Sequence, residues 1–415
     1  MTYPRARVVV TGSELVRGDR RDANGPYLAR ELTRLGLEPE RVTVVGDGEP
    51  ALGVALRDGL GADLLVTSGG LGPTHDDRTV ELLARAAGLE VEVDEELRAR
   101  IEEISRAVAE RLRRPYADFE PGVRKQATRP VGSSAVGLAG TAPALVVPTQ
   151  QAVVVVLPGP PRELQRLWPL ALGHDVVRRV LERATPPVRS VLRFFGASES
   201  EIARALEDQV AGDVDITICA RDFEIVVELF GDGAGVAAAL RERAGRHLFA
   251  EDERPVAEIV IEELRRRGWT LATAESCTGG MIAERITEIP GSSDAFVGSV
   301  VAYADEVKER ELAVPANVLA AHGAVSGETA AAMARGARER LRVDCAIAVT
   351  GIAGPDGGTA EKPVGLVYLH AETPEASRAV EFSYGADRDS IRRRATVAGL
   401  HLLRRALAQN RRDSV

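Results

Sequence analysis

The fold of the first part of the chain is decided by one stretch, residues 63–77, which reads DLLVTSGGLGPTHDD. Its first five residues predict a strand around the apolar run Leu-Leu-Val, a glycine-rich turn follows, and the pattern predicts a helix from Arg78. The same alternation continues on both sides, with strands expected at 6–12, 42–45 and 153–157 and helices at 23–35 and 51–60. Strands at this spacing with helices between them predict βαβ units and a parallel sheet.

The chain of 415 residues is long enough for two or three domains of ordinary size. Residues 1–172 hold the α/β pattern described above. Residues 185–250 begin with Thr-Pro-Pro and predict a small α+β module without a catalytic cluster, which we interpret as a spacer or an oligomerisation unit. After the charged segment 251–255, residues 255–410 again alternate strands and helices and predict a second α/β domain.

Composition excludes several classes of protein. Lys plus Arg is 53 and Asp plus Glu is 62, a net charge of −9, which argues against a general nucleic-acid or membrane-surface binder. The apolar runs are far shorter than the ~20 residues of a membrane helix, and no signal-peptide pattern follows Met1, so we expect a cytoplasmic protein. The three cysteines show no CxxC spacing, so neither a disulfide framework nor a zinc site is expected.

Lysine is scarce in this sequence. Only Lys125, Lys308 and Lys362 are lysines among the 53 basic residues. Arginine cannot give up its proton in a protein, whereas lysine can act as a base. A position that stays lysine in such a background is a candidate for a role that needs an amine, although a few lysines can also persist by chance.

The third region contains a candidate nucleophile. Ser276 stands where an expected strand at 270–274 has ended and a glycine-containing helix is expected to begin. This position suits a nucleophile or an anion contact, and it also suits a helix N-cap. Tyr303 ends another expected strand, and Lys308 lies five residues further on, where it either serves as a base for Ser276 or is a solvated helix lysine. The glycine loop at 350–355, with Lys362 close behind it, offers backbone N–H groups to an oxyanion or a phosphate.

These segments, read together, resemble the C-terminal domain of the CinA (competence/damage-inducible protein) family. The motifs are AESCTGG at 274–280, AY at 302–303 with EVK at 306–308, GAVS at 323–326, TGIAGP at 350–355 and KPVG at 362–365. The resemblance implies a nicotinamide-mononucleotide deamidase that needs no cofactor, with Ser276 as nucleophile, Lys308 as base and Tyr303 assisting. It further implies that Thr350 and the following backbone hold the oxyanion. The residues it implies for substrate binding in this domain are Thr278, Gly279, Gly351, Gly354 and Lys362. The family usually has Ser where Ala304 stands.

The first region contains a second candidate site. Its glycine loop at 69–72 offers backbone N–H groups to a phosphate, and Asp76 and Asp77 suit either a divalent cation or, for Asp77, a helix cap. His75 has no second histidine at ligand spacing, so we expect it to form hydrogen bonds rather than to bind zinc.

With GSE at 12–14, DAN at 22–24, KQA at 125–127, GTAP at 140–143 and LPGPP at 157–161, this region resembles the CinA N-terminal domain. The resemblance implies a three-layer α/β fold of molybdopterin-binding type and an ADP-ribose pyrophosphatase activity that depends on Mg, Co or Mn. The residues it implies for substrate binding are Gly69, Gly70, Gly72, Thr74, Pro158, Gly159 and Asn24, and those for the metal are Glu14, Asp76 and Asp77. Departures from the family pattern stand at Ser13, Gly137-Leu138 and Ala144, beside this pocket.

The sequence thus predicts a pyridine-nucleotide salvage enzyme that acts on nicotinamide mononucleotide, with a second site for ADP-ribose, and a homodimer is expected from its apolar, alanine-rich helices. In one alternative the first domain is a non-catalytic molybdopterin or nucleotide binder that regulates the enzyme. In another the protein is a DNA-uptake partner, which the net charge of −9 disfavours.

Overall fold

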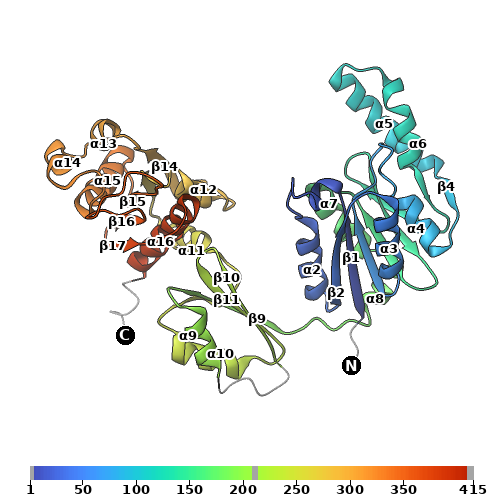
Figure 1. Cartoon of the computed structure of the whole chain (residues 1–415), viewed down its shortest axis with the longest axis horizontal. Coiled ribbons are helices and arrows are strands. Elements are labelled where there is room, and N and C mark those ends of the chain that lie inside the picture. The colour runs from blue at the N-terminus through green and yellow to red at the C-terminus, as the bar shows by residue number, and fades with distance from the viewer. Residues whose placement is uncertain (1–3, 208–213, 409–415) are drawn as a thin grey trace. The chain divides into compact units, whose positions relative to one another are not determined.

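The computed structural model describes residues 4–207 and 214–408 (Figure 1). It consists of two compact units, Met1–Pro187 and Val188–Val415. Residues 208–213 of the second expected region and residues 409–410 at the end of the third lie outside the described residues.

The first unit is built on a six-stranded sheet with the order β2-β1-β3-β8-β7-β6. Its strands are β1 (Arg5–Thr11), β2 (Glu38–Val45), β3 (Leu64–Ser68), β6 (Ser134–Leu138), β7 (Pro143–Pro148) and β8 (Val153–Leu157). The strands β2, β1, β3 and β8 are parallel, as the alternation of strands and helices predicts, whereas β7 and β6 add two antiparallel strands at one edge. A separate two-stranded sheet pairs β4 (Val91–Val93) with β5 (Thr128–Pro130).

Helices cover both faces of the six-stranded sheet and give the unit three layers. The helices of the unit are α1 (Ser13–Val16), α2 (Asn24–Arg34), α3 (Glu49–Gly59), α4 (Thr79–Ala87), α5 (Glu95–Leu112), α6 (Glu120–Gln126), α7 (Pro161–Leu172) and α8 (Asp175–Leu181). Of these, α5 and α6 pack on each other around a smaller core that includes Leu97 and Val123. One buried apolar core joins α2, α7 and α8 to one face, with Leu32 and Trp168 near its centre. A second core joins α3 and α4 to the other face through Leu56 and Leu83. The predicted three-layer α/β class is confirmed.

The second unit begins with a four-stranded antiparallel sheet in the order β10-β11-β9-β12. Its elements are β9 (Arg189–Phe195), α9 (Glu199–Leu206), β10 (Asp215–Arg221), β11 (Glu224–Phe230), α10 (Ala234–Ala244) and β12 (Leu248–Ala250). A buried core that includes Phe194, Ile202 and Leu240 joins the two helices to the sheet. We call residues 188–250 the middle module.

The rest of this unit surrounds a five-stranded sheet in the order β14-β13-β15-β16-β17. Its strands are β13 (Leu271–Glu275), β14 (Phe296–Val301), β15 (Cys345–Gly351), β16 (Leu366–Glu372) and β17 (Ser377–Ser383). Its helices are α11 (Val256–Arg267), α12 (Met281–Thr287), α13 (Asp305–Leu312), α14 (Ala316–His322), α15 (Gly327–Leu341) and α16 (Arg388–Leu407). The strand β13 runs parallel to both β14 and β15, whereas β16 and β17 are antiparallel. None of the helices in the described ranges is long and apolar enough to cross a membrane.

Candidate functional site

Three parallel strands end at one edge of the five-stranded sheet and bring the predicted residues together. The backbone N–H of Ser276 donates to the carbonyl of Val349 on β15 at 3.0 Å, and that of Ala302 donates to the carbonyl of Glu275 at 2.8 Å. Because the carboxyl ends of parallel strands meet at the same edge, Ser276, Tyr303 and Thr350 each follow or end one of three neighbouring strands.

Ser276 lies in a turn and not at the start of a helix. Residues 276–280 form the turn, α12 begins only at Met281, and its N-cap is Gly280. The predictions that Ser276 begins or caps the helix are therefore wrong. The reason is local, because Gly279 and Gly280 have φ angles of 62° and 99° and extend the turn before the helix can begin. Ser276 is 8% exposed, and its hydroxyl makes no hydrogen bond to any residue that the structure describes.

The N-terminal amides of α12 already have an acceptor, the carboxylate of Glu275, which is completely buried. The backbone N–H groups of Gly280, Ile282 and Ala283 donate to it at 2.9–3.1 Å. The hydroxyls of Thr278 and Thr273 donate to it at 2.7 and 3.2 Å. These amides are therefore not available to an anion, contrary to the sequence-based prediction. Glu275 stands inside the quoted motif at 274–280, but its burial could not be read from that motif.

Lys308 is buried in the first turn of α13, with only 1% of its surface exposed. Its ammonium donates to the carbonyl of Tyr303 at 3.1 Å and lies 3.2 Å from the carboxylate of Asp305. The alternative of a solvated helix lysine is therefore wrong. In this arrangement the partners of the Lys308 ammonium are Tyr303 and Asp305, and no hydrogen bond joins it to Ser276.

Two arginines on α16 connect the loops of the site. Arg388 donates to the Tyr303 hydroxyl at 2.8 Å and to the carbonyl of Gly354 at 2.6 Å. One turn later, Arg392 donates to the carbonyls of Cys277 at 3.2 Å and Thr278 at 2.8 Å. Sequence reasoning missed both arginines. Their spacing of four residues, which places both side chains on one face of a helix, was the signal in the sequence that could have identified them. It is hard to notice because arginine supplies nearly all of the positive charge of this chain.

Thr350 and Lys362 hold the segment between α14 and α15. The buried Thr350 hydroxyl donates to the carbonyl of Ala324 at 2.7 Å. The Lys362 ammonium donates to the carbonyls of His322 at 2.6 Å and Val325 at 2.8 Å. Both polar groups predicted to contact substrate or oxyanion are thus committed to backbone carbonyls.

The remaining groups in these loops differ in whether they can bind or attack a substrate. The backbone N–H groups of Ala353 and Gly354 donate to nothing among the described residues, so they are the available donors in this glycine loop. Gly351 has a packing role, because an added Cβ would lie 2.8 Å from the carbonyl oxygen of Leu366. Burial raises the pKa of Cys277 to about 12, so the thiol next to Ser276 is protonated at neutral pH and is a poor nucleophile.

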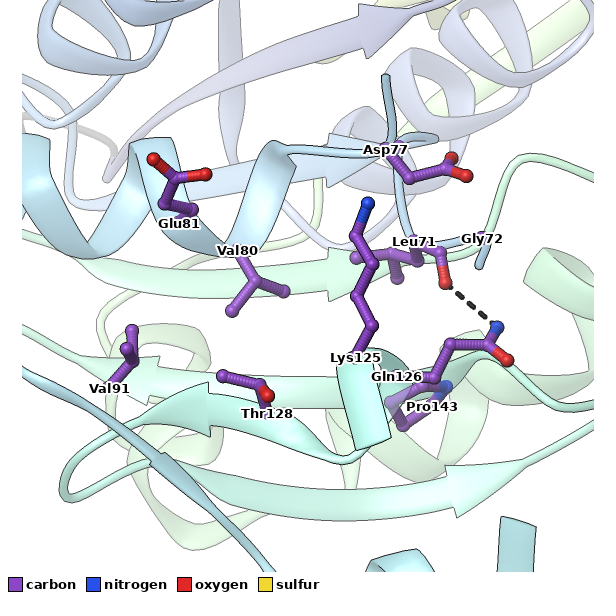
Figure 2. A pocket seen from close by; sticks show the side chains of 11 residues that line it. Leu71, Gly72, Asp77, Val80, Glu81, Val91, Lys125, Gln126, Thr128 and Pro143 are labelled. Atoms are coloured by element: carbon purple, nitrogen blue, oxygen red, sulfur yellow. Dashed lines mark hydrogen bonds between the residues drawn. The ribbon is translucent and has the colours of Figure 1, made fainter. Parts of the chain in front are cut away.

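The first unit has a cavity of about 220 Å³ beside its glycine loop (Figure 2). Figure 2 shows the Lys125 side chain rising between Glu81 and Asp77, and Lys125 donates to the carbonyl of Thr74. The amide of Gln126 donates to the carbonyl of Leu71 at 2.9 Å. The cavity is lined by Gly70, Leu71, Gly72, Asp77, Val80, Glu81, Val91, Lys125, Gln126, Thr128 and Pro143. Of these, sequence reasoning assigned Gly70, Gly72 and Asp77 to a site, and it singled out Lys125 without giving it a role.

A tight turn places two carboxylates around Thr74. The Thr74 hydroxyl lies 2.5 Å from Asp76 and 2.6 Å from Asp77, and the Thr74 N–H donates to Asp77 at 2.9 Å. The hydrogen bond from Thr74 lowers the pKa of Asp76 below its ordinary value. Asp77 does not cap α4, whose N-cap is Arg78, so that alternative is wrong. His75 is almost fully exposed, with its ring 4.0 Å from Asp76.

The remaining predicted residues of this unit separate into two groups. The Asn24 amide donates to the Ser68 hydroxyl at 2.9 Å and to the carbonyl of Gly159 at 2.7 Å, and Ser68 donates to the carbonyl of Pro158 at 3.2 Å. Asn24 therefore ties together the loops that follow β3 and β8. Glu14 does not join Asp76 and Asp77, since no group of three His, Cys, Asp or Glu side chains suited to a metal occurs within the described ranges.

Comparison with known proteins gives matches over both units. Residues 253–407 match the CinA C-terminal domain, and residues 7–181 match the probable molybdopterin binding domain. A CinA-like protein of Mycolicibacterium paratuberculosis is 42% identical over 429 residues, covering 97% of this chain and 98% of that protein. A CinA-like protein of Mycobacterium sp. (strain JLS) is 43% identical over 422 residues, covering 97% and 99%. Among solved structures, the competence/damage inducible protein CihA from Agrobacterium tumefaciens is 42% identical over 36% of this chain and 93% of its own, with a TM-score of 0.36.

Proposed function

The chain belongs to the CinA family, and on that premise we propose that its second unit deamidates nicotinamide mononucleotide to nicotinate mononucleotide and ammonia. One observation carries the proposal: an unbonded serine hydroxyl, a lysine buried in the first turn of α13 and free backbone N–H groups lie in the segments that follow three neighbouring strands of one sheet. A carboxamide needs a nucleophile, a proton carrier for the leaving ammonia and donors for a tetrahedral oxyanion.

In the proposed reaction, Ser276 Oγ attacks the carboxamide carbon while Lys308, which enters this step as the neutral amine, takes the hydroxyl proton. The oxyanion accepts from the N–H groups of Ala353 and Gly354, and Lys308 passes the proton to the amide nitrogen as ammonia leaves. Water then attacks the acyl-enzyme, and its proton returns to Ser276 by the same route. Tyr303, whose hydroxyl accepts a hydrogen bond from Arg388, positions the substrate. Thr350 fixes the loop that faces the substrate.

The test is ammonia release from nicotinamide mononucleotide by the wild type and by Ser276→Ala. We expect the substitution to abolish release, with both proteins equally folded by circular dichroism. Ser383→Ala, at an exposed serine on β17, is the matched control and is expected to keep full activity. Equal ammonia release by Ser276→Ala would overturn the proposal.

For the first unit we propose a pyrophosphatase site that cleaves ADP-ribose at the cavity beside the glycine loop. Two neighbouring carboxylates suit Mg²⁺, which is commonly held by one or two carboxylates together with substrate phosphates. Asp76 and Asp77 would hold the cation, and Glu14 is not part of the proposal. When bound, the cation would neutralise phosphate charge. Lys125 keeps the Thr74 turn in place beside it.

A second candidate function for this unit is nucleotide binding without catalysis. It is favoured by the lack, within the described residues, of any group of three metal-ligating side chains. AMP release from ADP-ribose with Mg²⁺ or Co²⁺ distinguishes the two. Release that disappears in Asp77→Asn supports the pyrophosphatase, whereas saturable binding without release at any metal concentration supports the binder.

A further inference from the structure

The hairpin that joins β10 to β11 in the middle module has an unusual turn. Arg221 pairs with Glu224, so the turn consists of Asp222 and Phe223 alone. Their φ angles are 50° and 63°, so both lie in the left-handed region. Two-residue hairpin turns with this geometry favour Asn-Gly or Asp-Gly, and a bulky residue such as phenylalanine is strained there. The hairpin would form more easily with glycine at 223, so the phenylalanine ring must have a role other than forming the turn.

Three consecutive residues of this tip contact the five-stranded part of the unit. Asp222 forms an ion pair with Arg285 of α12 at 3.3 Å. The Phe223 ring packs edge-to-face on Tyr384, with ring centroids 6.0 Å apart, and the Arg394 guanidinium lies 5.8 Å from its centre. The tip is therefore in contact with the end of one helix and the beginning of another.

The third residue of the tip makes a buried polar contact. The Glu224 carboxylate lies 2.7 Å from His401 Nε2 on α16, and both side chains are buried. Arg193 on β9 pairs with the second carboxylate oxygen at 2.5 Å. The His401 ring also stacks on Phe195 of the module at 3.8 Å. The contact between Glu224 and His401 favours one relative position of the two elements, because separating them would break a buried hydrogen bond and deprive His401 of this partner.

The elements that the tip touches are those that hold the proposed deamidase site. Arg285 belongs to α12, which begins directly after the turn 276–280. Tyr384 precedes the N-cap of α16 by three residues, and Arg394 lies two residues after Arg392. Arg392 holds the carbonyls of Cys277 and Thr278, and Arg388 holds the Tyr303 hydroxyl.

We propose that the tip, Asp222–Phe223–Glu224, is a brace that holds the first turns of α16 and the last turn of α12, and through them the Ser276 turn. The middle module is then a positioning part of the deamidase unit and not a spacer. The expected loss of kcat rests on the proposed deamidation, whereas the expected opening of the Ser276 turn does not. The left-handed conformation of Phe223 is retained because the ring must face Tyr384 and Arg394.

The chain supplies its own probe of the Ser276 turn. Cys277 is buried inside that turn, and Cys345 is buried in β15, away from it. Iodoacetamide labelling of the folded full-length chain, quantified peptide by peptide, reports the opening of the turn at Cys277 and any general loosening at Cys345. This readout is independent of any substrate.

The decisive variant is Phe223→Gly, which relieves the strained backbone and removes the ring. We expect an unchanged or higher Tm, labelling of Cys277 at least about fivefold faster with Cys345 unchanged, and a kcat about tenfold lower with KM within about twofold. Phe223→Tyr keeps the ring and should behave as wild type. Arg342→Gly relieves a φ of 53° at the end of α15 and is the matched control, with no expected change in labelling or kcat.

The outcomes separate the brace from the activity. Unchanged Cys277 labelling in Phe223→Gly overturns the brace, even if kcat changes. If Cys277 of Phe223→Gly is labelled faster but the wild type releases no ammonia, the brace is supported and the proposed deamidase activity is overturned. If Phe223→Gly lowers the Tm, the test uses Asp222→Asn instead, because that substitution removes only the ion pair to Arg285. Faster labelling of Cys277 in Asp222→Asn supports the brace. Labelling of Cys277 at the wild-type rate overturns the brace.

Discussion

The guanidinium of Arg388 donates a hydrogen bond of 2.8 Å to the hydroxyl of Tyr303, 85 residues earlier in the chain. Its other nitrogen donates to Gly354, so one side chain fixes the tyrosine and the glycine loop together. Tyr303 is 60% exposed, and an exposed phenol held in one place is suited to orient a ligand that arrives from solvent.

Replacing Arg388 by lysine should disconnect these two loops. A lysine cannot bridge both acceptors with the geometry of a guanidinium, so we expect kcat/KM for nicotinamide-mononucleotide deamidation to fall about 10- to 100-fold. Arg393→Lys, which alters an exposed ion pair with Asp389 on the same helix, is the control and should leave kcat/KM within about twofold. A wild-type value for Arg388→Lys would show that the bridge has no role in the reaction.

Lys308→Arg should keep the positive charge and remove the base. The side chain has almost no exposed surface, and arginine cannot release its proton, so ammonia release is expected to fall at least about 100-fold. Glu309→Gln, at an exposed neighbour on α13, should have no effect. Deamidation that survives Lys308→Arg undiminished would rule out lysine as the proton carrier.

Glu275→Gln should destabilise the second unit. Five donors surround a completely buried carboxylate, and the amide replaces one acceptor oxygen by a donor that faces other donors. We expect the free energy of unfolding to fall by about 2–4 kcal/mol, measured by urea denaturation. Glu284→Gln, at an exposed position of α12, should change it by less than about 0.5 kcal/mol. Equal effects of the two substitutions would contradict the role given to Glu275.

The stability of the second unit should depend on pH through His401. Burial lowers the pKa of His401 to about 4, despite the carboxylate of Glu224 beside it, with Arg193 and Arg404 also close. Between about pH 6.5 and pH 4 the unfolded histidine binds a proton that the folded one does not, so stability is present above this window and is lost as the pH falls through it. We expect the Tm of this unit to fall by several degrees across the window, measured by scanning calorimetry.

His401→Gln tests the assignment of this pH dependence. The variant should be less stable at pH 7 and should show a weaker fall in Tm below pH 6.5. His75→Gln, at an exposed histidine of the first unit, should follow the wild type. A slope unchanged by His401→Gln would assign the pH dependence to other groups.

Gly72→Ala should disturb the site of the first unit. An added Cβ would lie 2.4 Å from the Asp77 carboxylate, so that carboxylate has to move away from its bonds with Thr74, and AMP release from ADP-ribose is expected to disappear. The control is Gly53→Ala inside α3, where the nearest atom would be 3.6 Å away and the helix should gain about 1 kcal/mol. Full AMP release by Gly72→Ala would remove this turn from the site.

Most of the sheet framework was predictable because it depends on local patterns. The apolar run of β8, Val153–Leu157, can only be buried, and its bounds agree with the prediction. The antiparallel strands β6 and β7 were not predicted, since Ser134–Leu138 carries no strong alternation and becomes a strand through its pairing with β7. The helix α5, Glu95–Leu112, was also missed, because its charged residues dominate its narrow apolar face.

In the candidate site, the residues that were predictable are those whose position follows from the order of the strands alone. Ser276, Tyr303 and Thr350 each stand at the end of a predicted strand, and parallel strands bring such ends together. The roles of Glu275 and Arg388 depend on partners that only the folded chain supplies. For Glu275 these partners are the amides of α12, and for Arg388 they are two distant loops. No local pattern encodes such contacts.

The position of α16 after the other segments of the site has a consequence for synthesis. Translation delivers the chain from its N-terminus at about 5–20 residues per second, and domains generally fold as units. The segments that carry Ser276, Lys308 and the glycine loop are therefore made before the helix that connects them, Arg388–Leu407. A nascent chain has the parts of this site before it can hold them in place, so it should acquire activity only after α16 has been made.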